Sequence, residues 1–327
     1  MPTAISIALC TYNGAKHLRA QLESILCQTR LPDEIVVCDD ASTDGTVELL
    51  QKTLSPFRGK LTLHINPHNL GFKENFVQAI SLCTGDIICL SDQDDVWEKE
   101  KIALLSEALA DHPQAQLAFH DAKLVDSQLQ LLFPSFWTTM NPAFAPAAFS
   151  AGDYSRLFYA NVVQGAACAL RRELVEAALP FPEEALHDEW LALVATAKGG
   201  LIPISAPLLQ YRQDNNTLGG MPTSLSEKLV KWSGHLKCSA QTHYDRLQHQ
   251  AAVLKAFQKR YDGALDAGIA KALDCQLQNF TIRLHLIEGG LLSCLPSHSF
   301  CQTSPKEYLK DILAATLLHN QSARRTC

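Results

Sequence analysis

Five short apolar segments recur through the first part of the chain, and segments of helical periodicity separate them. The apolar segments have the length and composition of strands: Ala4–Cys10, Glu34–Cys38, Leu61–Asn66, Asp86–Ser91 and Gln116–His120. Between them, apolar residues repeat at helical spacing, as over Leu18–Leu26 and Phe72–Cys83. Strand followed by helix, repeated along the chain, predicts an α/β fold with a mostly parallel sheet flanked by helices. Ligands of such sheets bind outside the carboxyl ends of the strands.

The character of the sequence changes near Gly220. Strand-like segments become rare beyond this point, and helical spacing dominates, as in Leu247, Ala251, Leu254 and Phe257. The chain of 327 residues is long enough for one large α/β domain with an appendage. We therefore predict an α/β domain over residues 1–220 and a helical C-terminal extension over residues 221–327.

Composition excludes several classes of protein. The net charge of -6 argues against non-specific binding of nucleic acid, which requires a basic field. The 11 cysteines are scattered without a C-x-x-C spacing, so we expect neither a zinc site nor a disulfide framework. Free thiols in this number indicate a reducing compartment. We expect a cytoplasmic protein without a signal peptide or a membrane-spanning helix.

Polar residues follow the first two predicted strands. Thr11-Tyr12-Asn13-Gly14 comes after the first, and a loop offering backbone N–H groups there can bind an anion. Asp39 and Asp40 end the second, where carboxylates suit hydrogen bonds to a base or to ribose hydroxyls. Asp44, a few residues later, is better explained as a helix cap.

Three carboxylates follow the fourth predicted strand, at Asp92, Asp94 and Asp95. Such close negative charges repel one another unless a cation lies among them. Mg²⁺ and Mn²⁺ prefer oxygen ligands and can bridge a diphosphate. The alternative is a solvated acidic turn in which Asp95 caps the next helix.

Two common phosphate-binding motifs do not occur. No G-x-G-x-x-G follows the first strand, which argues against a dinucleotide redox enzyme. No G-x-x-x-x-G-K-[ST] is present, which argues against a P-loop ATPase.

Seven ordered sequence motifs resemble those of one enzyme family. They are SIALCTYNG, IVVCDDASTDGT, NPHNLGFKENF, CLSDQDDVW, NVVQGAACALRREL, LHDEWLALVA and YRQDNNTLGG, and together they cover about residues 4–220. The chain resembles family 2 glycosyltransferases of the GT-A fold, and within them the bacterial rhamnosyltransferase type. The extension beyond residue 220 carries no comparable motif.

The resemblance implies a role for each matching residue. The nucleotide-sugar donor would contact Thr11, Tyr12, Asn13, Asp39, Asp40, Asn69, Gly71, Asn75, Asp92, Arg212 and Gln213. The acceptor would contact Gln164, Gly165 and Trp190. Asp94, together with Asp92, would hold the metal ion on the diphosphate.

Asp188 would be the general base. Displacement at the anomeric carbon requires a carboxylate within hydrogen-bond reach of the acceptor hydroxyl, and Arg212 with a metal ion can stabilise the leaving diphosphate. A single base without a second, nucleophilic carboxylate implies inversion. The alternative for Asp188 is a cap for the helix that follows.

One motif departs from the family pattern. Relatives of this type carry a histidine after Arg-Gln, whereas Tyr211-Arg212-Gln213 is followed here by Asp214. Either Asp214 is an oxygen ligand for Mg²⁺ or Mn²⁺, or the metal site is weakened.

The resemblance also implies partners. We expect a dTDP-rhamnose or UDP-sugar donor and a glycan or lipid-linked acceptor in bacterial surface polysaccharide synthesis. The apolar stretch Leu284–Leu295 fits ordinary helix packing, and the alternative is peripheral contact of the extension with the inner membrane face. Two other functions stay open. One is a non-catalytic nucleotide-sugar-binding or scaffold protein, and the other is a nucleotidyltransferase, although the loop after the first strand carries only Lys16.

Overall fold

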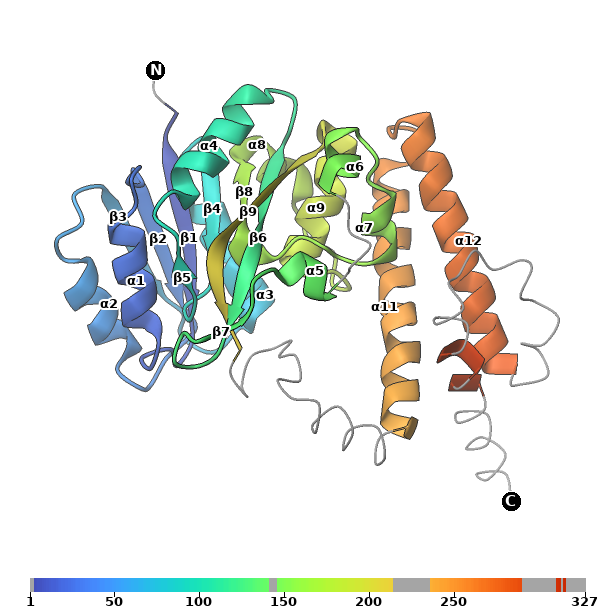
Figure 1. Ribbon diagram of the computed structural model, residues 1–327, viewed down its shortest axis with the longest axis horizontal. Coiled ribbons are helices and arrows are strands. Elements are labelled where there is room, and N and C mark those ends of the chain that lie inside the picture. Colours follow the sequence, from blue (N-terminus) through green and yellow to red (C-terminus); the bar gives the residue numbers. More distant parts are fainter. Residues whose placement is uncertain (1–2, 141–145, 214–235, 290–309, 313, 316–327) are drawn as a thin grey trace. The chain divides into compact units, whose positions relative to one another are not determined.

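The computed structural model describes residues 3–140, 146–213, 236–289, 310–312 and 314–315 (Figure 1). The chain divides into two compact units. The first contains the sheet and the helices packed on it. The second contains α11 and α12, together with the short segments Phe158–Ala160 and Pro182–Ala185. Each unit is described by itself.

The described strands of the first unit form a single mixed sheet in the order β3-β2-β1-β4-β8-β6-β9-β5, with β7 paired on β6. The strands are β1 (Ile5–Thr11), β2 (Glu34–Asp39), β3 (Lys60–Ile65), β4 (Ile87–Ser91), β5 (Val96–Trp97), β6 (Leu117–Val125), β7 (Leu131–Phe133), β8 (Cys168–Arg171) and β9 (Leu201–Arg212). The five strands predicted from the sequence correspond to β1, β2, β3, β4 and β6.

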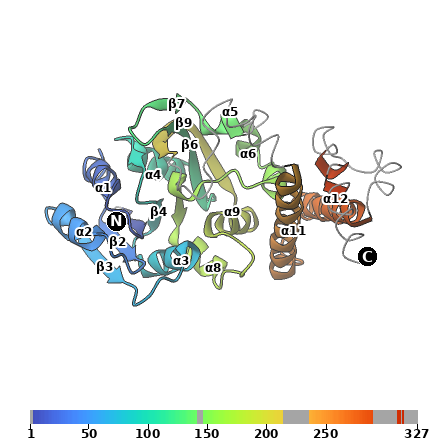
Figure 2. The same ribbon diagram turned by 90° about the horizontal axis from the view of Figure 1, so that it is seen from below.

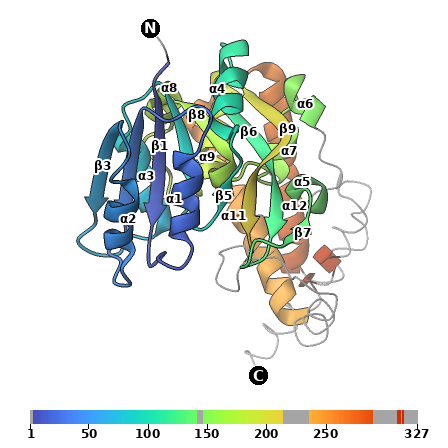
Figure 3. The same ribbon diagram turned by 60° about the vertical axis from the view of Figure 1, so that its left-hand side comes forward.

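Helices cover both faces of this sheet. α1, α2 and α4 lie on one face, and α3, α8 and α9 lie on the other (Figures 2 and 3). Their bounds are α1 (Leu18–Leu26), α2 (Thr46–Leu54), α3 (Phe72–Leu82), α4 (Lys101–Asp111), α8 (Arg172–Ala178) and α9 (His187–Lys198). The short helices are α5 (Phe136–Met140), α6 (Pro146–Ser150), α7 (Ser155–Tyr159) and the 3-10 turn η1 (Gly165–Ala167). The predicted α/β fold is confirmed.

The inner strands are apolar because helices cover them on both faces. Every residue of β1 and β2 is buried, and the main core contains Ile7, Leu9, Ile35 and Val37. β1 pairs in parallel with β2 and β4, and β2 pairs in parallel with β3. Parallel pairing brings the carboxyl ends of these strands to one edge, where the polar loops begin.

The sheet changes direction at β8. This strand is antiparallel to both of its neighbours, β4 and β6. β9 then runs parallel to β6 and antiparallel to β5. The sheet is therefore mixed beyond β4, and the end of β9 reaches the loop that follows β4.

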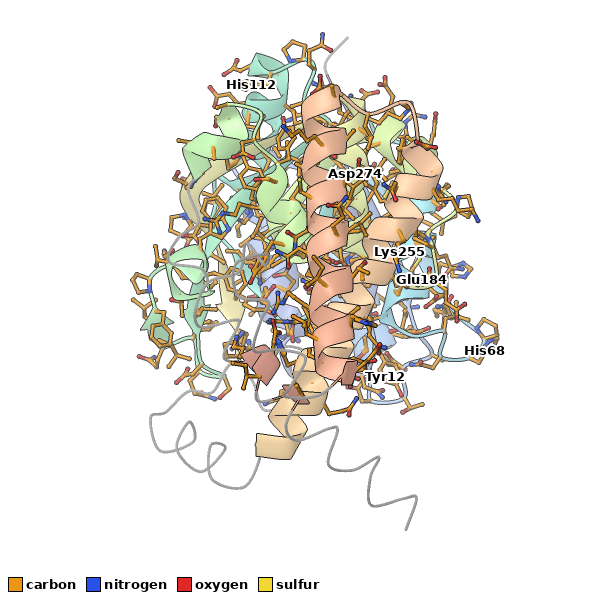
Figure 4. The ribbon with its side chains drawn as sticks, turned by 90° about the vertical axis from the view of Figure 1, so that its right-hand side faces the viewer. Tyr12, His68, His112, Glu184, Lys255 and Asp274 are labelled. Atoms are coloured by element: carbon orange, nitrogen blue, oxygen red, sulfur yellow. The ribbon has the colours of Figure 1, made fainter. Side chains whose placement is uncertain are left out.

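The second unit is a helical hairpin of α11 (Leu236–Tyr261) and α12 (Ala267–Gly289). Its buried apolar residues recur at helical spacing and include Leu254, Phe257, Leu277 and Phe280. On the exposed side, Asp274 of α12 (labelled in Figure 4) accepts a hydrogen bond from Gln258 at 2.6 Å. None of the helices in the described part of the chain is both long and apolar enough to span a membrane.

Candidate active site

Asp39 organises the ends of the first two strands. Thr11 and Asp39 are register partners on β1 and β2, and the Thr11 hydroxyl donates to the Asp39 carboxylate at 2.7 Å. The same carboxylate accepts the backbone N–H and the hydroxyl of Ser42 at 2.9 and 2.6 Å. Asp39 is completely buried. Its charge thus fixes the loop after β2 against the end of β1.

Asp40 and Asn75 support the loop before α3. Asp40 accepts the backbone N–H groups of Leu70 and Gly71 at 2.8 and 2.9 Å and the Asn66 amide at 2.9 Å. Asn75 accepts from Asn66 at 3.0 Å and donates to the Cys38 carbonyl oxygen. Both side chains are buried, and these hydrogen bonds shape the loop, while their contact with a nucleotide stays a prediction.

Asn69 and Gly71 form the exposed part of that loop. The Asn69 side-chain oxygen accepts the Gly71 N–H at 3.1 Å, and Gly71 has a φ of 90°. A residue with a side chain is strained at this φ, which explains the glycine. The loop therefore has a defined shape beside the tip of β2.

Tyr12 and Asn13 lie at the surface after β1. The Tyr12 side chain is 48% exposed (Figure 4) and the Asn13 side chain accepts the Thr43 N–H at 2.9 Å. Gln93 holds this loop from the other side. Its amide accepts the Tyr12 N–H at 2.8 Å and donates to the Tyr12 carbonyl oxygen at 3.0 Å. Sequence reasoning missed Gln93, because it considered only the carboxylates on either side.

The carboxylates after β4 repel one another. Burial raises the pKa of Asp92 to about 7, and repulsion from Asp94 and Asp188 adds to the shift. Burial likewise raises the pKa of Asp95 well above its usual value, with contributions from Asp94 and Asp92. Asp95 accepts the Arg212 N–H at 3.0 Å through one oxygen, while its other oxygen has no hydrogen-bond partner. The loop after β4 therefore brings several carboxyl groups together in surroundings with little access to solvent.

Asp188 comes from α9 and lies near this loop. Its carboxylate accepts the Gly165 N–H at 3.2 Å through one oxygen and the Glu189 N–H at 2.7 Å through the other. Repulsion from Asp188 contributes to the raised pKa of Asp92, so the two carboxyl groups influence each other. Residues more than ninety positions apart in the sequence thus meet at one edge of the sheet.

His187 fixes the start of α9. Its ring stacks on Phe76 at 4.1 Å and meets Phe72 edge-on at 6.0 Å. Burial lowers the pKa of His187, so the imidazole is neutral at pH 7. A Cβ on Gly165 would lie 2.7 Å from its Nε2 atom, so only glycine fits beside the ring. This packing sets the position of the neighbouring Asp188.

Comparison with known proteins identifies the family. The sequence profile described as "Glycosyl transferase family 2" matches residues 6–177, which is more than half of the chain. The chain belongs to glycosyl transferase family 2.

Two relatives align over part of this chain. The abequosyltransferase RfbV of Salmonella typhimurium is 33% identical over 121 residues, which are 36% of each chain. The dTDP-rhamnosyl transferase RfbG of Shigella flexneri is 29% identical over 131 residues, which are 39% of this chain and 43% of the relative. The alignments thus span well under half the length of these relatives.

Solved structures confirm the GT-A type of fold. Staphylococcus aureus TarS 1-349 in complex with UDP-GlcNAc superposes with a TM-score of 0.57 at 18% identity, over 95% of this chain and 79% of that chain. The mannosyltransferase PcManGT of Pyrobaculum calidifontis, solved with GDP-Man and Mn²⁺, gives a TM-score of 0.54 at 18% identity, over 100% and 81% of the two chains.

Trp190 and Arg212, two of the predicted site residues, make contacts inside the protein. Trp190 is completely buried, and its indole donates to the Ala178 carbonyl oxygen at 2.9 Å, so it is a core residue and not a wall of the acceptor site. The buried Arg212 guanidinium donates to the carbonyl oxygens of Asp94 and Ser127 at 2.7 and 2.6 Å. It therefore supports the acidic loop Asp92–Asp95 that follows β4, while its contact with a diphosphate stays a prediction.

The end of β9 contributes another residue that sequence reasoning passed over. The Tyr211 hydroxyl hydrogen-bonds to the Gln164 side chain, and burial raises the pKa of Tyr211, with repulsion from Asp92 adding to the shift. Gln164 is thereby held beside the acidic loop. Gln213 is buried, and its backbone N–H donates to the Val125 carbonyl oxygen at 2.8 Å.

The described residues do not form a complete metal site. No group of three or more His, Cys, Asp or Glu side chains in the described ranges is arranged to hold a metal ion, and Asp214 lies outside those ranges. The donors that are present still fit Mg²⁺ or Mn²⁺. Asp92 and Asp94 supply carboxylate oxygens, and burial, with repulsion from Asp94 and Asp188, raises the pKa of Asp92, so a divalent cation would stabilise its ionised form.

Proposed function

We propose that this protein is an inverting glycosyltransferase that moves a sugar from a nucleoside diphosphate to a hydroxyl group of an acceptor, with Asp188 as the base. The observation that carries the proposal is the position of Asp188. Its carboxylate is anchored by the N–H groups of Gly165 and Glu189 and lies close enough to Asp92 to repel it.

The donor would bind at the ends of β1 and β2. Thr11, Tyr12 and Asn13 form the end of β1 and the loop after it, and Asp39 ends β2. Asn69 and Gly71 form the neighbouring rim. The exposed Tyr12 ring offers a flat surface for a nucleobase. The name of RfbG, a dTDP-rhamnosyl transferase, supports dTDP-rhamnose as the donor, and the TarS structure in complex with UDP-GlcNAc supports UDP-sugars as the second choice.

The cation would bind to Asp92 and Asp94, with Asp214 as a further oxygen ligand. Bound Mg²⁺ or Mn²⁺ would supply positive charge for the leaving diphosphate. Arg212 donates to the backbone at Asp94, which holds this carboxylate-bearing loop in place before any donor binds.

The transfer is a single displacement. The acceptor oxygen forms a bond to the anomeric carbon, the bond from that carbon to the diphosphate oxygen breaks, and Asp188 takes the hydroxyl proton. Because the acceptor attacks from the side opposite the leaving group, the configuration inverts. Gln164 and Gly165 would form the floor beneath the acceptor.

The acceptor would be a glycan or a lipid-linked saccharide of a bacterial surface polysaccharide. The support for this choice is similarity to two bacterial sugar transferases, the abequosyltransferase RfbV and the dTDP-rhamnosyl transferase RfbG. The enzyme would act in the cytoplasm, with residues 221–327 as an extension that contacts the inner membrane face.

The donor is tested by thermal shift and the base by substitution. We expect dTDP-rhamnose or a UDP-sugar with Mn²⁺ to raise the unfolding temperature. Asp188→Asn should keep donor binding but lower turnover at least 10²-fold, because the amide cannot accept the proton. Asp111→Asn, an exposed change on α4, is the matched control. Near-normal turnover by Asp188→Asn would refute the base assignment.

A further inference from the structure

Lys101 is a completely buried lysine at the first position of α4. Its Nζ atom donates a hydrogen bond to the carbonyl oxygen of Ala166 and lies 3.7 Å from the centroid of the Trp97 ring. A buried ammonium group is unfavourable unless its surroundings compensate for lost hydration. The packing of α4 alone therefore does not explain a buried ammonium group at this position.

The surroundings keep this group charged. Burial lowers the pKa of Lys101 to about 8, and nearby acidic groups, including Asp95 and Asp92, oppose that decrease. The Trp97 ring face provides a cation–π contact. At pH 7 the side chain is an ammonium group that donates a hydrogen bond to the turn at Ala166.

That turn also carries the contact to Asp188. Ala166 follows Gly165, and the Gly165 N–H donates to the Asp188 carboxylate at 3.2 Å. Lys101 thus donates a hydrogen bond to a carbonyl oxygen of this turn, while Asp188 accepts a hydrogen bond from an N–H group of the same turn. Both contacts depend on the tertiary fold, since 65 positions separate Lys101 from Ala166 and 23 separate Gly165 from Asp188.

We propose that Lys101 is a positioning residue that orients the base Asp188 by holding the Ala166 carbonyl and, with it, the Gly165 N–H. The proposal rests on the proposed function, because it assigns a role in the same transfer. It concerns the acceptor side of the site and leaves the donor loops at Thr11 and Asp39 unaffected.

A purely structural role and a positioning role predict different results for Lys101→Met. Methionine has a similar length and no charge, and replacing a buried ionic group by a well-packed apolar one is often neutral or stabilising. A structural lysine would then lose little activity. A positioning lysine would lose turnover although the fold is kept, since a base displaced by about 1 Å can cost 10²-fold in rate.

The experiment compares Lys101→Met with Lys99→Met, the same change at an exposed position two residues earlier. Calorimetry with dTDP and with UDP, each with Mn²⁺, measures nucleotide binding. Release of dTDP from dTDP-rhamnose, or of UDP from UDP-GlcNAc, measures kcat. We expect both variants to bind nucleotide within twofold of the wild type and only Lys101→Met to lose at least tenfold in kcat.

A double-mutant cycle with Asp188→Asn tests whether Lys101 acts through the base. If it does, adding Lys101→Met to Asp188→Asn lowers kcat no further, because the oriented group is already inactive. Independent, multiplicative losses would overturn the proposal, and so would a wild-type kcat in Lys101→Met.

A second variant keeps the proposal testable if Lys101→Met does not fold. Lys101→Gln retains a hydrogen-bond donor on a side chain one bond shorter. We expect its kcat to be lower than that of the wild type and higher than that of Lys101→Met, or than that of Asp188→Asn if Lys101→Met does not fold. A kcat equal to that of the wild type would overturn the proposal. Absence of turnover in the wild type with every donor would instead refute the proposed function.

Discussion

Gln93 shows how one side chain connects two loops. It stands between Asp92 and Asp94, and its amide forms both an accepting and a donating hydrogen bond with the Tyr12 backbone. A Cβ on Gly14 would lie 2.1 Å from the Gln93 side-chain oxygen, so the two loops touch there. Gln93 thus holds the loop after β4 against the loop after β1.

We expect Gln93→Ala to weaken nucleotide binding. Two lost hydrogen bonds correspond to about 1–3 kcal/mol, or roughly a 5- to 100-fold higher Kd for dTDP or UDP by calorimetry. Gln51→Ala, an exposed change on α2, serves as the control and should bind normally. An unchanged Kd for Gln93→Ala would show that the Tyr12 loop holds its shape without the amide.

At the scale of elements, the start of α9 depends on the turn η1. The His187 ring fills the space between Phe76 and Gly165, so the helix approaches the turn as closely as a glycine allows. Asp188, the next residue, receives its hydrogen bond from the same turn. Helix and turn thus position the base together.

Gly165→Ala should disturb this contact. The added methyl group would lie 2.7 Å from His187 Nε2, so either the ring or the turn must move. Overpacking of this kind costs about 1–3 kcal/mol of the free energy of unfolding, measured by denaturant titration. We expect kcat to fall at least tenfold with little change in nucleotide Kd. Unaltered kcat would contradict the coupling between the turn and Asp188.

The helical hairpin of the second unit contains its own buried ionic group. Arg283 of α12 donates to both oxygens of Asp311 at 2.9 and 3.0 Å, and His243 of α11 lies 2.8 Å from the same carboxylate. All three side chains are buried. The group ties Asp311 to both long helices.

Asp311→Asn should destabilise this unit. Breaking a buried ion pair from one side costs about 3–5 kcal/mol, because Arg283 would keep its charge without a counter-ion. The free energy of unfolding is measured by urea titration monitored by circular dichroism. Asp274→Asn, the same change at an exposed site of α12, should have an effect below about 1 kcal/mol. Equal effects of the two variants would contradict the assignment.

At the scale of the whole molecule, Glu34 ties four strands of the first unit near their amino-terminal ends. Its carboxylate, at the start of β2, forms an ion pair with Lys60 of β3 at 2.6 Å and accepts from Ser6 of β1 at 2.5 Å and from Thr84 before β4. Burial raises the pKa of Glu34, but these hydrogen bonds outweigh burial and lower it to about 2.

This carboxylate should govern part of the acid stability. Because its pKa is lower in the folded chain than the ordinary 4.5, its contribution is complete above about pH 4.5 and is lost as the pH falls towards 2. The difference corresponds to at most about 3 kcal/mol. Glu34→Gln should flatten the decline of unfolding free energy between pH 4.5 and 2. A variant with the wild-type slope would refute the assignment.

The sequence by itself determined the α/β fold class, the family and five strands, because apolar periodicity and local motifs encode them. It also indicated Asp39, Asp92, Asp94 and Asp188, since carboxylates at strand ends or helix starts carry a recognisable local pattern. Local motifs of this kind do not reveal which distant neighbour a side chain meets.

The tertiary structure alone decided the contacts between distant segments. The antiparallel insertion of β8, the burial of Trp190 in the core and the use of Arg212 on backbone carbonyls all depend on pairings that no local pattern contains. The same holds for Lys101 and Gln93, whose partners lie 65 and 81 positions away. Side-chain direction follows from the packing of whole elements, and that packing is settled only when the chain has folded.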